Sequence, residues 1–263
     1  MTPDPALSEA LRRLAFRPGG MPLVGVSGAQ GSGKTTLARA VAARIGAACL
    51  SLDDVYLSAA ERMALAESVH PLFRTRGPPG THDLALLSGT LDALSRAKPG
   101  DRTALPAFDK LADDRRPPDD WPMFEGRPSA IVIDGWCLGA TAQAAEDVAD
   151  PINALEEEAD PDGVWRSHVN AQLAGPYANL FNRFDGFLHL VAPDFGVVQG
   201  WRTEQEAGLL GNAVPEARKA QLARFIQHFE RITRHMLGGG RRPGVVAHLG
   251  PDRGLLGPPR ESR

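Results

Sequence analysis

The chain has 263 residues, 43% of them hydrophobic and 23% charged, and its 29 basic and 32 acidic side chains leave a formal net charge of −3. This composition predicts one globular, enzyme-sized domain, and the acidic balance argues against a nucleic-acid partner because phosphate backbones attract basic surfaces. No run approaches the roughly 18 apolar residues of a membrane span, and Asp4 and Glu9 precede any apolar run, unlike a secretory signal. Cys49 and Cys137 lie inside apolar runs, which predicts reduced, buried thiols in a cytoplasmic protein without membrane partners.

The first predicted element is a short amphipathic helix over residues 5–16. Its apolar residues Leu7, Leu11 and Leu14 share one helical face, and a proline-glycine turn follows. We expect residues 1–20 to form a packing appendage rather than part of a site.

Five short apolar runs lack the polar alternation of a half-exposed strand, and helical segments separate them. The first run leads into a glycine-rich turn and then into a predicted helix at 35–45, where apolar residues recur every four positions. We expect a doubly wound, mostly parallel α/β sheet with helices on both faces, which is a three-layer fold. The strands are predicted at residues 23–27, 49–52, 130–133, 187–191 and 245–249.

The remaining segments are rich in proline, glycine and charged residues. Residues 74–83 and 106–128 are predicted loops, and loops at the carboxyl edge of such a sheet commonly carry binding groups. We expect one domain over residues 21–250 with a lid at about 200–212, and a flexible tail over 251–263 because it holds few apolar residues.

The strongest motif is a phosphate-binding loop, in which two glycines flank four residues and lysine and threonine follow. The glycines let backbone N–H groups turn towards phosphate oxygens, and the next helix offers its positive end. Lys34 is predicted to neutralise the β- and γ-phosphates of a nucleoside triphosphate. The predicted nucleotide-binding residues are Gly28, Ala29, Gln30, Gly31, Ser32, Gly33, Lys34, Thr35 and Thr36.

Two oxygen-bearing side chains are predicted to lie beside a Mg²⁺ ion that bridges those phosphates. Thr35 offers a hydroxyl, and Asp134 follows the apolar strand at 130–133 with a carboxylate that reaches the metal through water. A carboxylate at a strand end can also cap a turn, but the phosphate loop favours the metal role.

Adjacent carboxylates follow the second predicted strand. Asp53 or Asp54 could accept a proton from an acceptor hydroxyl at the carboxyl edge of the sheet. Because adjacent side chains point apart, only one should face the phosphates. We predict Asp53 as the base and Asp54 as a loop or substrate contact.

Arg202 opens a polar helical stretch after the strand at 187–191, where an arginine can neutralise a transferring phosphoryl group. We predict it as a catalytic lid residue. The loops hold further basic residues that suit an anionic acceptor, although exposed arginines are commonly plain surface residues. The histidines His70 and His82 lack metal-ligand spacing and are interpreted as loop hydrogen-bonding residues. The loop cations are Arg74, Arg76, Lys110, Arg115 and Arg116.

Seven segments together resemble the D-glycerate 3-kinase group of P-loop kinases, within the wider set of phosphoribulokinase, uridine kinase and pantothenate kinase. They span most of residues 22–249 in a specific order. The resemblance implies ATP-dependent phosphorylation of a primary hydroxyl, with D-glycerate as acceptor and 3-phosphoglycerate as product. The segments are GAQGSGKTT, SLDDVY, TRGPPGTHD, PAFDK, IDGWCLGA, PINALEEEADPDGVWR and QGWRTEQE.

Carried over by position, the resemblance implies acceptor or base work at Asp53 and a lid arginine at Arg202. Two positions depart from the group's pattern. Asp134 stands where glutamate is frequent, which is chemically mild, and Phe229 stands where tyrosine is frequent, which either removes a pocket hydroxyl or changes packing only. The acceptor-binding residues expected from the resemblance and from loop chemistry are Asp54, Tyr56, Arg76, His82, Asp83, Lys110 and Arg115.

Three alternatives remain open at this point. The acceptor could be another small hydroxyl compound, such as a nucleoside or pantothenate. A phosphate loop also serves switches that hydrolyse nucleotide without an acceptor, although the chain lacks the Asn-Lys-x-Asp and Leu-Ser-Gly-Gly-Gln signatures of two such classes. A binding-only relative is the third alternative, against which the intact phosphate loop argues.

Overall fold

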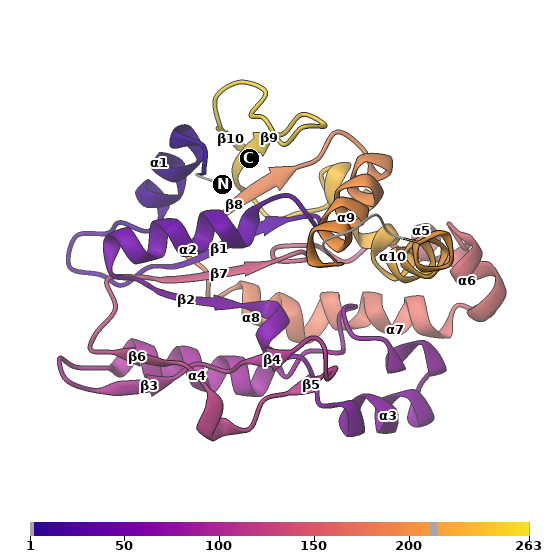
Figure 1. Ribbon diagram of the computed structural model, residues 1–263, viewed down its shortest axis with the longest axis horizontal. Helices are drawn as coiled ribbons and strands as arrows, with labels where there is room; N and C mark the ends of the chain where they lie inside the picture. The colour runs from indigo at the N-terminus through magenta and orange to yellow at the C-terminus, as the bar shows by residue number, and fades with distance from the viewer. Residues whose placement is uncertain (1–2, 211–214, 263) are drawn as a thin grey trace.

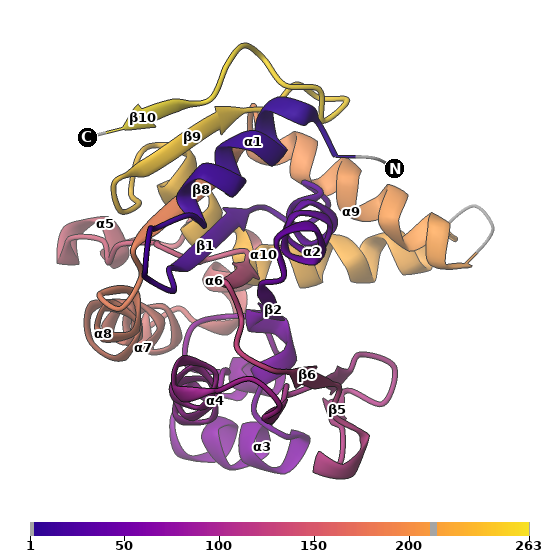
Figure 2. The ribbon, with the colours of Figure 1, turned by 90° about the vertical axis from the view of Figure 1, so that its left-hand side faces the viewer.

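The structure of the protein, a computed structural model, describes residues 3–210 and 215–262. Six strands form one sheet in the order β10-β9-β8-β1-β7-β2, in which only β10 runs antiparallel to its neighbour (Figures 1 and 2). This confirms the predicted mostly parallel α/β fold. The strands are β1 (Leu23–Gly28), β2 (Ala48–Ser51), β7 (Ile131–Gly135), β8 (Gly186–Val191), β9 (Gly244–His248) and β10 (Arg260–Ser262).

Helices cover both faces of this sheet, as the buried apolar strands require. The helix after the phosphate loop ends at Gly46, which adopts a left-handed conformation (φ 68°) that favours glycine. The helices are α1 (Pro5–Leu14), α2 (Lys34–Ile45), α3 (Ala59–Ser68), α4 (Leu84–Arg96), α5 (Ala145–Ala149), α6 (Ala154–Ala159), α7 (Val164–Gln172), α8 (Ala178–Phe181), α9 (Phe195–Leu210) and α10 (Glu216–Leu237).

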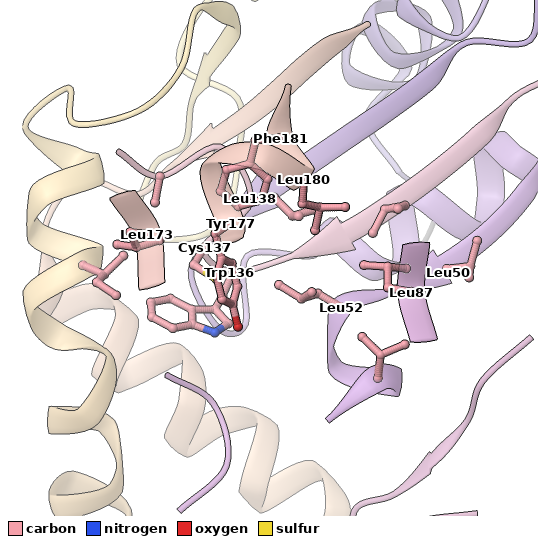
Figure 3. Packing of buried hydrophobic residues seen from close by; sticks show 14 of the residues in the cluster. Leu50, Leu52, Leu87, Trp136, Cys137, Leu138, Leu173, Tyr177, Leu180 and Phe181 are labelled. Carbon is pink, nitrogen blue, oxygen red and sulfur yellow. The ribbon is translucent and has the colours of Figure 1, made fainter. Parts of the chain in front are cut away.

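Two hydrophobic clusters lie on opposite faces of the sheet. One joins the strands to α4, α7, α8 and part of α10, and Leu87 and Phe181 are among its buried residues (Figure 3). The other joins them to α1, α2 and α9, with Leu11 of the predicted N-terminal helix completely buried. Each such aliphatic side chain contributes about 2 kcal/mol by leaving water. The clusters therefore fix the carboxyl edge of the sheet, where the candidate site lies.

The segment between β2 and β7 lies beyond the β2 edge of the sheet (Figures 1 and 2). It holds α3, α4 and two small antiparallel sheets, so the predicted loop at 106–128 contains short paired strands. A 3-10 turn, Leu52–Val55, connects β2 to this segment. The small strands are β3 (Arg102–Ala104) with β6 (Met123–Glu125), and β4 (Phe108–Asp109) with β5 (Asp114–Arg115).

The structure differs from the flexible tail expected over residues 251–263. Within the described part of this tail, β10 pairs with β9, and backbone N–H groups of Gly250 and Gly254 are held in a tight turn. Backbone hydrogen bonds order this segment although its sequence holds few apolar residues.

Cys137 is buried, Cys49 is half-buried, and both are free thiols. Among the helices in residues 3–210 and 215–262, none combines the length and the apolar character needed to cross a membrane.

Candidate active site

The phosphate loop connects β1 to α2, and the N-cap residue of α2 is Gly33, which has no side chain to bond the first N–H groups of the helix. Gly31 (φ 77°) and Gly33 (φ 86°) adopt left-handed conformations, which bend the backbone around the start of α2. No side chain among residues 3–210 and 215–262 caps α2, so its first N–H groups are available for an anion. The side-chain oxygens of Gln30 and Ser32 are buried without a hydrogen-bond partner among the described residues. The Ser32 hydroxyl and the free N–H groups of this loop can donate, which fits a bound polyphosphate, whereas the Gln30 oxygen can only accept.

Lys34 and Thr35 begin α2 directly below this loop. Lys34 Nζ lies 3.4 Å from the Ala29 carbonyl, and burial lowers the pKa of its ammonium although the nearby carboxylates oppose this effect. The Thr35 hydroxyl donates to Asp134 Oδ2 at 2.6 Å. Burial raises the pKa of Asp134, while the charge of Lys34 and the Thr35 bond act in the opposite direction.

The Thr35–Asp134 contact is set by the sheet. Strand β7 lies between β1 and β2, and the register places Asp134 opposite Val26 and Ser51, near the carboxyl ends of these strands. Mg²⁺ binds hydroxyl and carboxylate oxygens as ligands and keeps several waters in its coordination shell. Two protein oxygens are therefore enough to hold it. Within the part of the chain that the structure describes, no cluster of three or more His, Cys, Asp or Glu side chains offers a closed metal site.

The adjacent carboxylates occupy different environments on the 3-10 turn. Asp53 Oδ2 accepts from Lys110 Nζ at 2.8 Å, and Asp53 Oδ1 accepts from the Tyr56 hydroxyl at 2.9 Å. Burial would raise the pKa of Asp53, but the charges of Lys110 and Lys34 and these hydrogen bonds outweigh it and hold the pKa below its usual value. Burial, followed by the charge of Asp53, raises the pKa of Asp54 to about 6. The nearby cations therefore outweigh burial at Asp53, whereas burial and the charge of Asp53 outweigh the cations at Asp54.

The loop arginines already have carboxylate partners within the protein. Arg76 pairs with Asp113, and Arg115 Nη2 lies 3.1 Å from Asp83 Oδ2 and 3.5 Å from Glu61 Oε2. Asp83 also caps α4. These pairs hold the two predicted acceptor loops against each other beside Asp53.

His82 lies buried next to Asp53, stacked on Tyr56 with ring centroids 4.6 Å apart. Its Nδ1 is 2.5 Å from the Tyr177 hydroxyl, which also accepts from the Gly80 N–H at 3.1 Å. Which atom donates in the Nδ1–Tyr177 contact depends on the His82 tautomer, and the second ring nitrogen of His82 is Nε2. That Nε2 is buried without a partner among the described residues, and burial lowers the pKa of His82 to about 3.

The predicted lid over 200–212 falls on α9, and residues 211 and 212 lie outside the described residues. Arg202 is half-buried on this helix. Its neighbour Trp201 is buried against the phosphate loop, where a Cβ at Gly31 would lie only 2.7 Å from Trp201 Cβ. The middle of α9 thus packs on the phosphate loop.

Phe229 of α10 packs against Trp136 in an edge-to-face contact with centroids 4.9 Å apart. Its ring also fills the space at Gly77, whose carbonyl accepts from Trp136 Nε1 at 3.1 Å. The phenylalanine at this position therefore serves packing.

Sequence reasoning missed several side chains that contact the site residues, among them Tyr177, Asp113 and Arg253. Tyr177 lies in a π-helical turn, Leu173–Tyr177, and the proline inside that helical segment is the one sequence signal that marks it. Asp113 and Arg253 lie in irregular segments, where spacing predicts no partner.

No family model matches the sequence. The uncharacterized kinase mug58 of Schizosaccharomyces pombe is 29% identical over 229 residues, covering 81% of this chain and 80% of that protein. The chloroplastic D-glycerate 3-kinase of Arabidopsis thaliana is 32% identical over 200 residues, covering 71% of this chain and 41% of that protein. The structure of a D-glycerate 3-kinase from Cryptococcus neoformans matches with a TM-score of 0.73 and 23% identity, covering 98% of this chain and 95% of that one.

The sheet order, the phosphate loop and these matches define the fold of a P-loop kinase. Within that class, the chain is homologous to D-glycerate 3-kinase, which confirms the resemblance of its sequence motifs. It spans about two fifths of the length of the plant relative.

Proposed function

We propose that the protein transfers the γ-phosphoryl group of ATP to the primary hydroxyl of D-glycerate and forms 3-phosphoglycerate and ADP. The observation that carries this proposal is the 32% identity over 200 residues to a D-glycerate 3-kinase. The closeness of Asp134 and Asp53 to the phosphate-loop residues Thr35 and Lys34 supports it. The free thiols support a reducing, cytoplasmic place of action.

The nucleotide would be held by the loop from Gly28 to Thr36, with Lys34 neutralising the β- and γ-phosphates. Thr35 and Asp134 would hold Mg²⁺, the latter through water. When bound there, the ion would offset negative charge on the phosphate oxygens. Arg202 would approach from α9 and stabilise the transferring group.

The acceptor would bind between the phosphate loop and the segment beyond β2. Asp53 would orient the acceptor hydroxyl and take its proton. The hydroxyl oxygen would form a bond to the γ-phosphorus while the bond between that phosphorus and the β-phosphate oxygen breaks. The low pKa of Asp53 makes it a weak base. A weak base suits a loose transition state, because the acceptor hydroxyl then loses its proton late in the reaction. Lys110 is half-exposed, so it can exchange its contact with Asp53 for the acceptor carboxylate. The other proposed acceptor contacts are Asp54, Tyr56, Arg76, His82, Asp83 and Arg115.

Product analysis by ³¹P NMR tests this proposal. Incubation with Mg-ATP and D-glycerate should give the phosphomonoester resonance of 3-phosphoglycerate, and the folded Lys34→Ala variant should give none. Formation of 2-phosphoglycerate, or of free phosphate alone, would contradict it.

A further inference from the structure

The C-terminal turn, defined here as residues 250–254, contacts the phosphate loop directly. Arg253 Nε donates to the Gly31 carbonyl at 2.7 Å, and Arg253 Nη2 lies 2.7 Å from Glu204 Oε2 of α9. The guanidinium lies over the Trp201 ring at 5.2 Å, and Trp201 Nε1 donates to the Pro251 carbonyl at 2.6 Å. One side chain therefore joins three segments that are distant in sequence.

The backbone conformation of Arg253 is unfavourable for a residue with a side chain, which indicates that the arginine side chain has a role at this position. Its φ of 67° is left-handed, a conformation that costs a non-glycine residue about 1 kcal/mol and that glycine adopts freely. The turn is nevertheless closed around it, with the Arg253 N–H donating to the Gly250 carbonyl at 2.9 Å. Glycine would fit the backbone better but could not reach Gly31.

The bond to Gly31 has a direct consequence for the phosphate loop. The Gly31 carbonyl and the Ser32 N–H belong to one trans peptide plane and point in opposite directions. Because Arg253 holds the carbonyl on one side of this plane, the Ser32 N–H is held on the other side, where it donates to the Ala29 carbonyl at 3.2 Å and closes a turn within the phosphate loop. The conformation of this turn shapes the loop that would cradle a β-phosphate.

We propose that Arg253 is a positioning residue that orients the Gly31–Ser32 peptide for the nucleotide polyphosphate, with Trp201 and Glu204 orienting its guanidinium. This role goes beyond the proposed acceptor chemistry and holds for any acceptor. It also assigns a function to a segment whose sequence predicts only a flexible tail.

Calorimetric titration with ADP and with AMP tests the proposal without turnover, so its failure is distinguishable from failure of the proposed kinase activity. Arg253→Gly removes the guanidinium and relieves the backbone, so its melting temperature should stay within a few degrees of the wild type. Its Kd for ADP should rise about tenfold, the loss expected of a charge-assisted hydrogen bond. Its Kd for AMP, which lacks the β-phosphate, should change less than about twofold.

Arg242→Ala is the matched control, because Arg242 also donates to one carbonyl, that of Ala178, and to one side-chain oxygen, that of Asn182. It should leave both affinities unchanged. Wild-type ADP affinity in Arg253→Gly would overturn the proposal. Equal weakening of ADP and AMP would overturn it too, since it would place the guanidinium on the nucleoside instead of the loop.

Discussion

Replacement of Asp53 by asparagine should lower kcat about 100- to 10,000-fold, the contribution of a positioned general base, equivalent to about 3 to 5 kcal/mol of activation free energy. The amide oxygen can still accept from Tyr56, but the amide nitrogen would face the Lys110 ammonium, now 2.8 Å from Asp53 Oδ2. Because the Lys110 side chain is 56% exposed, the lost ion pair should cost only about 1 kcal/mol of stability. Activity should therefore fall far more than stability.

The matched variant is Asp54→Asn, which removes the neighbouring carboxylate from the same turn and should keep turnover within about tenfold of the wild type. Initial rates at saturating Mg-ATP, thermal melts and ADP titrations on both variants separate chemistry from folding. The pH profile gives a second readout. With Asp53 as base, kcat/KM should stay level as pH falls through 6, since the pKa of Asp53 lies below its usual value while that of Asp54 is about 6. A fall in kcat/KM centred near pH 6 that Asp54→Asn abolishes, or near-normal turnover of Asp53→Asn, would refute the assignment.

Lys110→Gln removes the strongest charge that lowers the pKa of Asp53, so the acid limb of the kcat/KM profile should move to higher pH, by about one pH unit after solvent screening. An acid limb at the wild-type pH would contradict a role of the ion pair. Thr35→Val should raise the Mg²⁺ concentration for half-maximal rate about 10- to 100-fold, and an unchanged Mg²⁺ titration would remove this hydroxyl from the metal site. Glu156→Gln should lower the free energy of unfolding by about 3 kcal/mol in denaturant titrations, because it removes the negative charge and one of the two acceptor oxygens that face the buried Arg231 guanidinium. A loss as small as that from breaking the exposed Arg12–Glu9 pair on α1 would contradict this.

The sheet and the nucleotide side of the site could be predicted because they depend on local sequence. Apolar runs without alternation give buried parallel strands, and the carboxyl ends of such strands meet, which brings Thr35 to Asp134. The phosphate loop depends on glycine conformations that its own sequence specifies.

The remaining contacts depend on pairs distant in sequence, for which spacing carries no signal. Arg76 and Arg115 look like free cations until the fold brings Asp113 and Asp83 to them. The C-terminal turn is ordered by backbone hydrogen bonds, which composition does not reveal.

The central claim is tested most directly by the initial rate of ADP release from Mg-ATP with D-glycerate, L-glycerate, uridine, pantothenate or no acceptor. D-glycerate should stimulate the rate strongly, and the other compounds should leave it near the rate without acceptor. An acceptor-independent rate as fast as that with D-glycerate would indicate a hydrolysing switch, and stimulation by uridine or pantothenate instead would assign a different acceptor.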